Sequence, residues 1–172
     1  NYGTQFPLSK SYISHPLYSE LESKIEQMYG ITPIITKNST LGHLSVIPTL
    51  IRDEDAVIMD HQVHWSVQNV CQLLKLRGIP VEMIRHSNLT MLEDKIKQLT
   101  SKCNKIWYMA DGVYSMFGDY APIPELLALT QKYSQLNLYF DDVHGMSWRG
   151  KNGTGFIFDA IKELPENCVV VS

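Results

Sequence analysis

The sequence predicts an α/β protein with three layers, in which helices cover both faces of a mainly parallel, doubly wound sheet. Strand-like and helix-like segments alternate along the 172 residues, which is the pattern of such folds. The strand-like segments are apolar almost throughout, as in strands that are covered on both faces. The length suits one well-buried core and is too short for two typical domains, so we predict that residues 1–172 form a single domain segment.

The first predicted elements lie before residue 60. Apolar residues at helical spacing between Pro16 and Gly30 predict an amphipathic helix, with proline near its start and glycine just past its end. Residues 31–36 predict a buried strand. A polar turn at residues 37–40 then leads into a helix that contains Pro48 as an irregularity.

The later elements continue the alternation. We expect strands at residues 56–59, 81–84, 106–109, 138–140 and 168–171, and helices at residues 63–77, from residue 90 and from residue 124. Thr90 and Glu93 have the spacing of a capping box at the start of one helix, and we interpret both Asn88 and Thr90 as caps there. Pro124 opens the next helix.

Composition excludes several classes of function. The net charge of -3 is spread thinly, without a basic stripe, so we expect neither nucleic acid nor an anionic membrane surface as partner. No apolar run approaches the ~18 residues of a membrane helix. Three widely spaced cysteines, Cys71, Cys103 and Cys168, fit neither a disulfide framework nor a zinc site and predict buried thiols in a reducing, cytoplasmic compartment. His61 and His64 lack a third ligand, so no metal site is expected.

Two tracts at predicted strand ends carry the functional signal. Residues 109–119 read MADGVYSMFGD, and residues 138–145 read LYFDDVHG. Asp111 and Ser115 therefore end one strand, while Asp141 and His144 end another. Ligands of open α/β sheets bind outside the carboxyl ends of the strands. We predict that both strand ends face one crevice and handle a cofactor, although Asp141 taken alone is also compatible with a helix N-cap.

Both tracts resemble the α-oxoamine synthase branch of pyridoxal-phosphate (PLP) enzymes, in which they read roughly E/D-G-V-F-S-M-D-G-D and V-D-D/E-A-H-G. The resemblance implies that Asp141 pairs with the ring nitrogen of PLP and that His144 binds its phenolic oxygen. It also implies that Ser115 helps to orient the ring and that Asp111 takes the place of the family's acidic residue. Residues 60–66 resemble D-x-x-x-H-A-S, so His64 would stack on the ring face.

Residues 37–43, KNSTLGH, stand where this family has S-S-G-F/Y-A-A-N. The resemblance implies that Asn38, Ser39 and Thr40 bind the cofactor phosphate, because the N-terminus of a helix attracts anions. A plain N-cap is the alternative. The family's Asn is replaced here by His43.

The resemblance implies an enzyme, a PLP-dependent acyltransferase that joins an amino acid to an acyl-CoA and works as a homodimer. In that family the catalytic lysine follows the strand matched by residues 169–172, and Lys151 and Lys162 precede this strand. We therefore expect residues 1–172 to be a large-domain segment, truncated at both ends. Two alternatives stay open: an aminotransferase or decarboxylase of the same fold, and a non-catalytic homologue.

Overall fold

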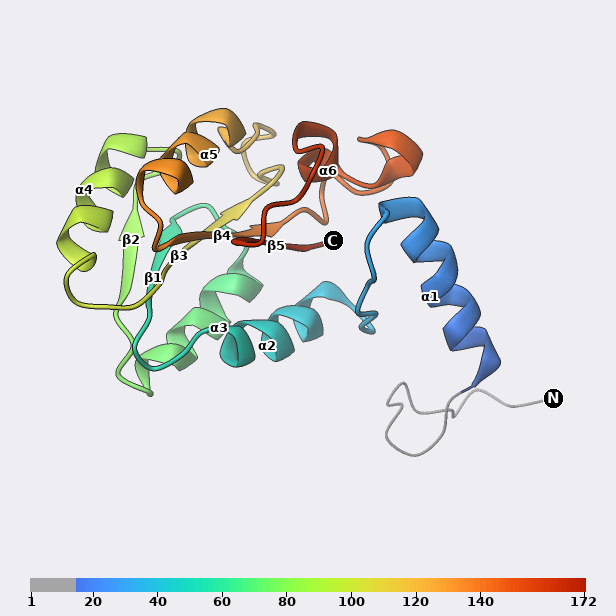
Figure 1. Cartoon of the computed structure of the whole chain (residues 1–172), viewed down its shortest axis with the longest axis horizontal. Coiled ribbons are helices and arrows are strands. Elements are labelled where there is room, and N and C mark those ends of the chain that lie inside the picture. The colour runs from blue at the N-terminus through green and yellow to red at the C-terminus, as the bar shows by residue number, and fades with distance from the viewer. Residues whose placement is uncertain (1–14) are drawn as a thin grey trace.

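The computed structural model describes residues 15–172 and has the predicted three layers (Figure 1). Within this part of the chain, five parallel strands form one sheet in the order β2-β1-β3-β4-β5. Helices α2 and α3 cover one face of the sheet, and α4, α5 and α6 cover the other. The predicted fold class is confirmed.

The strands agree with the predicted segments to within two residues at either end. Their bounds are Ala56–Asp60 (β1), Val81–Ile84 (β2), Ile106–Asp111 (β3), Leu136–Asp141 (β4) and Cys168–Val171 (β5). All residues of β1, β3 and β4 are buried, as expected for strands with helices on both faces.

The helices occupy the segments between these strands. Their bounds are Pro16–Tyr29 (α1), Ser39–Leu50 (α2), Trp65–Lys75 (α3), Leu89–Leu99 (α4), Ile123–Lys132 (α5) and Phe156–Ala160 (α6), with a short 3-10 helix at Lys151–Gly153. Pro48 lies inside α2, and its carbonyl oxygen accepts a hydrogen bond from Arg77 Nη1 at 3.0 Å. Gly30, at φ 73°, ends α1 in the left-handed region that glycine favours.

Two hydrophobic clusters lie on opposite faces of the sheet, because successive residues of a strand point to opposite sides. In β4, Leu138 and Phe140 belong to the cluster under α4, α5 and α6. Tyr139, between them, packs in the cluster under α2 and α3. Asp141 follows Tyr139 by two residues, so its side chain is directed to the face that α2 and α3 cover.

Two sequence predictions are wrong. Residues 31–36 do not form a buried strand: Ile34 is 87% exposed, and no strand of the sheet pairs with this segment. Pro33 explains the difference, because it has no N–H to give to a strand ladder. The capping box of Thr90 and Glu93 is the second wrong prediction, because Thr90 lies inside α4. The other predicted cap, Asn88, is confirmed: its side chain accepts a hydrogen bond from the backbone N–H of Met91 at 2.8 Å.

Helix α1 lies apart from the layers, on the side of the molecule where β5 ends (Figure 1). None of its residues is buried. Tyr29 at its end packs edge-on against Phe158 of α6, with 5.1 Å between the ring centroids. Among residues 15–172, no helix has the length and apolar character required to cross a membrane.

The three cysteines are free thiols. Cys71 and Cys168 are buried, and burial raises the pKa of each to about 12. Cys103 is half-buried. The prediction of buried, unbridged thiols is therefore confirmed for Cys71 and Cys168.

Candidate functional site

The carboxyl ends of β3 and β4 bring Asp111 and Asp141 side by side. The two residues are register partners in the parallel pair, so the predicted meeting of these strand ends is confirmed. Asp111 is 1% exposed and Asp141 is 5% exposed. Buried carboxyl groups are costly unless they are paired, so their partners indicate what this edge of the sheet can hold.

Asp141 is held through both oxygens of its side chain. Its Oδ2 lies 2.9 Å from Nε2 of His43, and its Oδ1 accepts a hydrogen bond from the backbone N–H of Val143 at 3.2 Å. His43 comes from α2 and is fully buried. The sequence showed His43 as a departure from the family pattern but did not predict it as a site residue. The replacement of the family's Asn by His43 was the one sequence feature that could have identified it.

Asp111 has one oxygen paired and one free. The backbone N–H of His64 donates to Oδ1 at 3.0 Å, whereas the buried Oδ2 has no hydrogen-bond partner. Burial raises the pKa of Asp111 to about 8, against the lowering effect of the His64 bond, and the charge of Asp141 raises it further. A buried oxygen without a partner fits a site that accepts a polar ligand at this point.

His64 and His144 lie near each other, with 6.4 Å between their ring centroids. His64 is the N-cap of α3, and its Nδ1 lies 2.7 Å from the hydroxyl oxygen of Ser66. His144 is exposed in the loop after β4, where its carbonyl oxygen accepts a hydrogen bond from the indole of Trp148. Trp65, which replaces the family's small residue, is 60% exposed, and its ring centroid lies 5.9 Å from that of His64.

The turn at Asn38, Ser39 and Thr40 is the N-terminus of α2. The side chain of Asn38 accepts a hydrogen bond from the backbone N–H of Leu41 at 2.9 Å, so Asn38 is an N-cap. Ser39 and Thr40 are half-buried in the first turn. His43 lies on the same helix, α2, little more than one turn after Ser39.

Ser115, a predicted site residue, and Asp142, the neighbour of Asp141, differ in their exposure. Ser115 is exposed in the turn after β3. Asp142 is fully buried, and its Oδ2 accepts a hydrogen bond from the backbone N–H of Ile157 at 2.8 Å. Burial raises the pKa of Asp142 to about 6, against the lowering effect of that bond. Asp142 thus ties the loop after β4 to α6.

A second carboxylate–imidazole group lies at the end of β1 and was missed by sequence reasoning. His86 Nδ1 lies 3.1 Å from Oδ1 of Asp60, and its Nε2 lies 2.8 Å from Oδ2 of Asp119. Burial lowers the pKa of His86, but the hydrogen bonds with Asp119 and Asp60 outweigh it, and the pKa is raised. His86 therefore connects the tract after β3 to β1.

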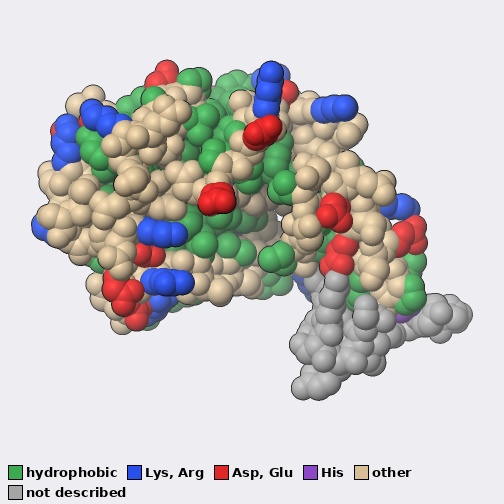
Figure 2. Space-filling view, viewed as in Figure 1, with side chains coloured by type: hydrophobic (Ala, Val, Ile, Leu, Met, Phe, Trp, Pro, Cys, Tyr) green, Lys and Arg blue, Asp and Glu red, His purple; other side chains and the backbone are tan. Residues whose placement is uncertain are grey.

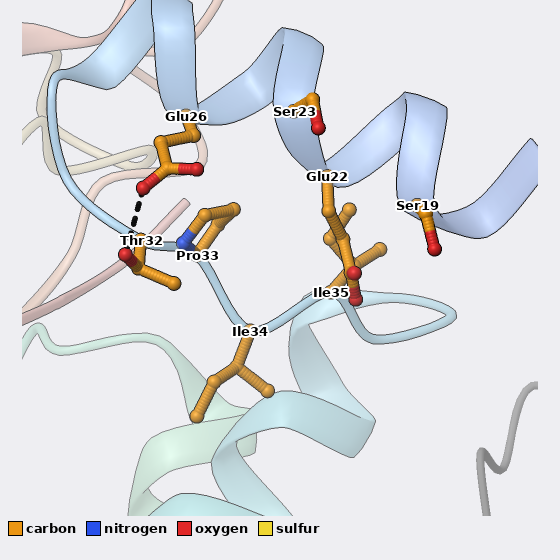
Figure 3. Close-up of a pocket in the computed structure, with 8 residues that line it drawn as sticks. All are labelled: Ser19, Glu22, Ser23, Glu26, Thr32, Pro33, Ile34 and Ile35. Atoms are coloured by element: carbon orange, nitrogen blue, oxygen red, sulfur yellow. Dashed lines mark hydrogen bonds between the residues drawn. The ribbon is translucent and has the colours of Figure 1, made fainter.

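A cavity of about 490 Å³ lies between α1 and residues 32–35 (Figure 3). Within it, Thr32 donates a hydrogen bond to Glu26 at 2.8 Å. None of the eight residues that line the cavity is a predicted cofactor-binding residue. The candidate site is therefore identified by the paired strand ends and not by this cavity.

The sequence matches known proteins over most of its length. The family model described as aminotransferase class I and II matches residues 4–172. The 8-amino-7-oxononanoate synthase of Thermosipho melanesiensis is 30% identical over 142 residues, which are 82% of this chain and 35% of the relative. The enzyme of the same name from Coprothermobacter proteolyticus is 32% identical over 139 residues, 80% of this chain and 34% of the relative. The chain thus spans about a third of these relatives.

Solved structures of serine palmitoyltransferases are also similar to this chain. The serine palmitoyltransferase of Sphingomonas wittichii superposes with a TM-score of 0.75 and 26% identity, covering 86% of this chain and 36% of that one. The serine palmitoyltransferase of S. paucimobilis with a bound PLP–myriocin aldimine superposes with a TM-score of 0.74 and 28% identity, with the same coverage. The resemblance to the α-oxoamine synthases is confirmed by these relatives.

Proposed function

Because the chain belongs to the aminotransferase class I and II family, we propose that it forms the cofactor-binding part of a PLP-dependent α-oxoamine synthase. The whole enzyme would condense an amino acid with an acyl-CoA and release free CoA. The observation that carries this proposal is the buried carboxylate of Asp141, which lies beside Asp111 at the carboxyl edge of the sheet with His64 capping the neighbouring helix.

Each predicted residue has a role in this proposal. Asp141 holds the ring nitrogen of PLP by a charge-assisted hydrogen bond, which favours the protonated nitrogen. His64 stacks on the ring, and His144 donates to its phenolic oxygen. When bound, PLP supplies an electron sink for negative charge on the substrate.

The remaining predicted residues act around the ring. Ser39, Thr40 and the cap residue Asn38 hold the phosphate at the N-terminus of α2. Asp111 offers its unpaired Oδ2 as a hydrogen-bonding group to the cofactor or the substrate. Ser115 lies in the turn that follows Asp111 and orients the ring from that side.

We also propose a homodimer in the cytoplasm, with residues 1–172 as a segment of the large domain. Large exposed apolar side chains follow three strands at the carboxyl edge: Trp65, Met116, Phe117 and Trp148. Exposed apolar side chains of this size favour a covering protein surface. On the face shown in Figure 2, positive and negative side chains are interspersed, with hydrophobic side chains between them.

The free thiols favour a reducing compartment.

The test uses the full-length protein with PLP, a panel of amino acids and acyl-CoA thioesters. We expect release of free thiol that depends on both substrates and on PLP. Asp141→Asn should lower kcat by roughly 100-fold or more, the size typical for loss of one preorganised electrostatic contact. The matched control is Asp94→Asn on α4, which makes the same chemical change at a carboxylate 61% exposed, and it should leave kcat unchanged.

The outcomes separate the three hypotheses. Keto acid formed from the amino acid without thiol release would favour an aminotransferase, and carbon dioxide release alone would favour a decarboxylase. A protein that binds no PLP would be the non-catalytic homologue. Full activity in Asp141→Asn would contradict the role of this carboxylate.

A further inference from the structure

His43 connects two polar side chains of β4. Its Nε2 lies 2.9 Å from Oδ2 of Asp141, and its Nδ1 lies 2.7 Å from the hydroxyl oxygen of Tyr139. His43 and Tyr139 are fully buried, and Asp141 is 5% exposed. Both ring nitrogens of the imidazole are therefore engaged, and solvent does not compete for either of them.

The arrangement follows from the alternation of β4 and the place of α2. Tyr139 and Asp141 are two residues apart, so their side chains share the face of the sheet that α2 covers. His43 lies on the buried side of α2, between the buried residues Gly42 and Ile47. One imidazole thus reaches both side chains of the strand.

The two partners of the imidazole favour one position for its proton. Burial and the nearby charge of Asp141 raise the pKa of Tyr139, so its hydroxyl keeps its proton and can donate it. When Tyr139 donates to Nδ1, the proton of the neutral imidazole must lie on Nε2, which then donates to Asp141. The other oxygen of Asp141 accepts from the backbone of Val143, so the plane of the carboxylate is fixed from both sides.

We propose that His43 is a positioning residue that orients Asp141 towards the ring nitrogen of PLP, and that Tyr139 sets the tautomer of His43. This inference rests on the proposed function. The family pattern has Asn at this position, and an Asn side chain offers one amide donor to Asp141 but no second ring nitrogen for Tyr139. His43 also belongs to the helix whose N-terminus is assigned to the phosphate, so α2 would bind the phosphate and also position the carboxylate that holds the ring nitrogen.

The experiment measures the ring nitrogen itself. The full-length protein is loaded with PLP labelled with ¹⁵N in the ring, and the ¹⁵N chemical shift reports whether this nitrogen is protonated. The variants are His43→Leu, His43→Asn, Tyr139→Phe and Asp141→Asn. We expect a protonated nitrogen in the wild type and an unprotonated one in Asp141→Asn.

His43→Leu should move the shift towards the unprotonated value and weaken PLP binding roughly tenfold, the size expected when a hydrogen bond to a charged group is lost. His43→Asn should restore most of the shift and of the affinity. Tyr139→Phe should weaken PLP binding by about threefold, because it removes only the group that sets the tautomer. If His43→Leu does not fold, His43→Asn and Tyr139→Phe still carry the test.

A measurement without cofactor tests the geometry independently of the proposed function. In the PLP-free wild type, the imidazole ¹⁵N shifts of His43 should indicate a neutral ring with its proton on Nε2. A ring protonated on Nδ1 alone would overturn the proposed tautomer. A wild-type shift and affinity in His43→Leu, together with a changed shift in Asp141→Asn, would overturn the positioning role while leaving the proposed function in place. A wild type that binds no PLP would overturn both.

Discussion

Asp111→Asn should remove part of the pH dependence of stability of the PLP-free protein. In the folded state burial raises the pKa of Asp111 from its ordinary value of 3.8 to about 8. Between these two values the folded protein retains a proton that the unfolded chain has released. The free energy of unfolding of the wild type therefore falls as the pH rises from about 4 to about 8.

The magnitude follows from the pKa difference. Each pKa unit corresponds to about 1.36 kcal/mol, so Asp111 accounts for a loss on the order of 6 kcal/mol across the whole window. Asn keeps an oxygen that can accept the hydrogen bond from the backbone of His64 and has no ionisation to suppress. The stability of Asp111→Asn relative to wild type should thus increase with pH and level off above pH 8.

Urea unfolding of the PLP-free full-length protein between pH 5 and pH 8, followed by tryptophan fluorescence, measures this difference. Asp142, whose pKa is also raised, is present in both proteins, and only its electrostatic coupling with Asp111 differs between them. Asp94→Asn serves as control and should run parallel to the wild type. Infrared spectra at pH 7 should show a protonated carboxyl band that Asp111→Asn lacks. A constant stability difference at every pH would refute the reasoning.

Two further predictions concern packing and capping. Gly145→Ala should destabilise the fold by about 2 kcal/mol, because the new Cβ would meet Asp142 Oδ1 and lie 2.6 Å from a backbone nitrogen. Gly42→Ala should change the stability by less than about 1 kcal/mol, because the nearest atom to its new Cβ lies 3.2 Å away. Thermal unfolding of the two variants tests this, and equal losses would contradict it. Asn88→Ala should cost about 1 kcal/mol and Thr90→Ala less than about 0.5 kcal/mol, measured by urea unfolding. A larger loss of stability in Thr90→Ala than in Asn88→Ala would indicate that Thr90 caps the helix after all.

Local sequence patterns were sufficient to predict most of the strands and helices. The apolar runs at β1, β3 and β4 are buried on both faces, and this signal does not depend on which strands are neighbours. The strand predicted at residues 31–36 failed because an apolar run forms a strand only where another strand can pair with it, and Pro33 cannot donate to a ladder. The sequence offered two caps for α4, because Asn88 and Thr90 both have capping side chains, and only the structure shows that Asn88 is the N-cap.

The sequence by itself determined the fold class, the strand ends that carry Asp111 and Asp141, and the family, because periodicity and motifs are properties of short segments. Tertiary structure alone decided that the imidazole of His43 contacts the carboxylate of Asp141, which follows it by 98 residues. It also decided that one oxygen of Asp111 has no partner. Such contacts depend on which helix covers which face of the sheet, and residue spacing along the chain does not record that choice.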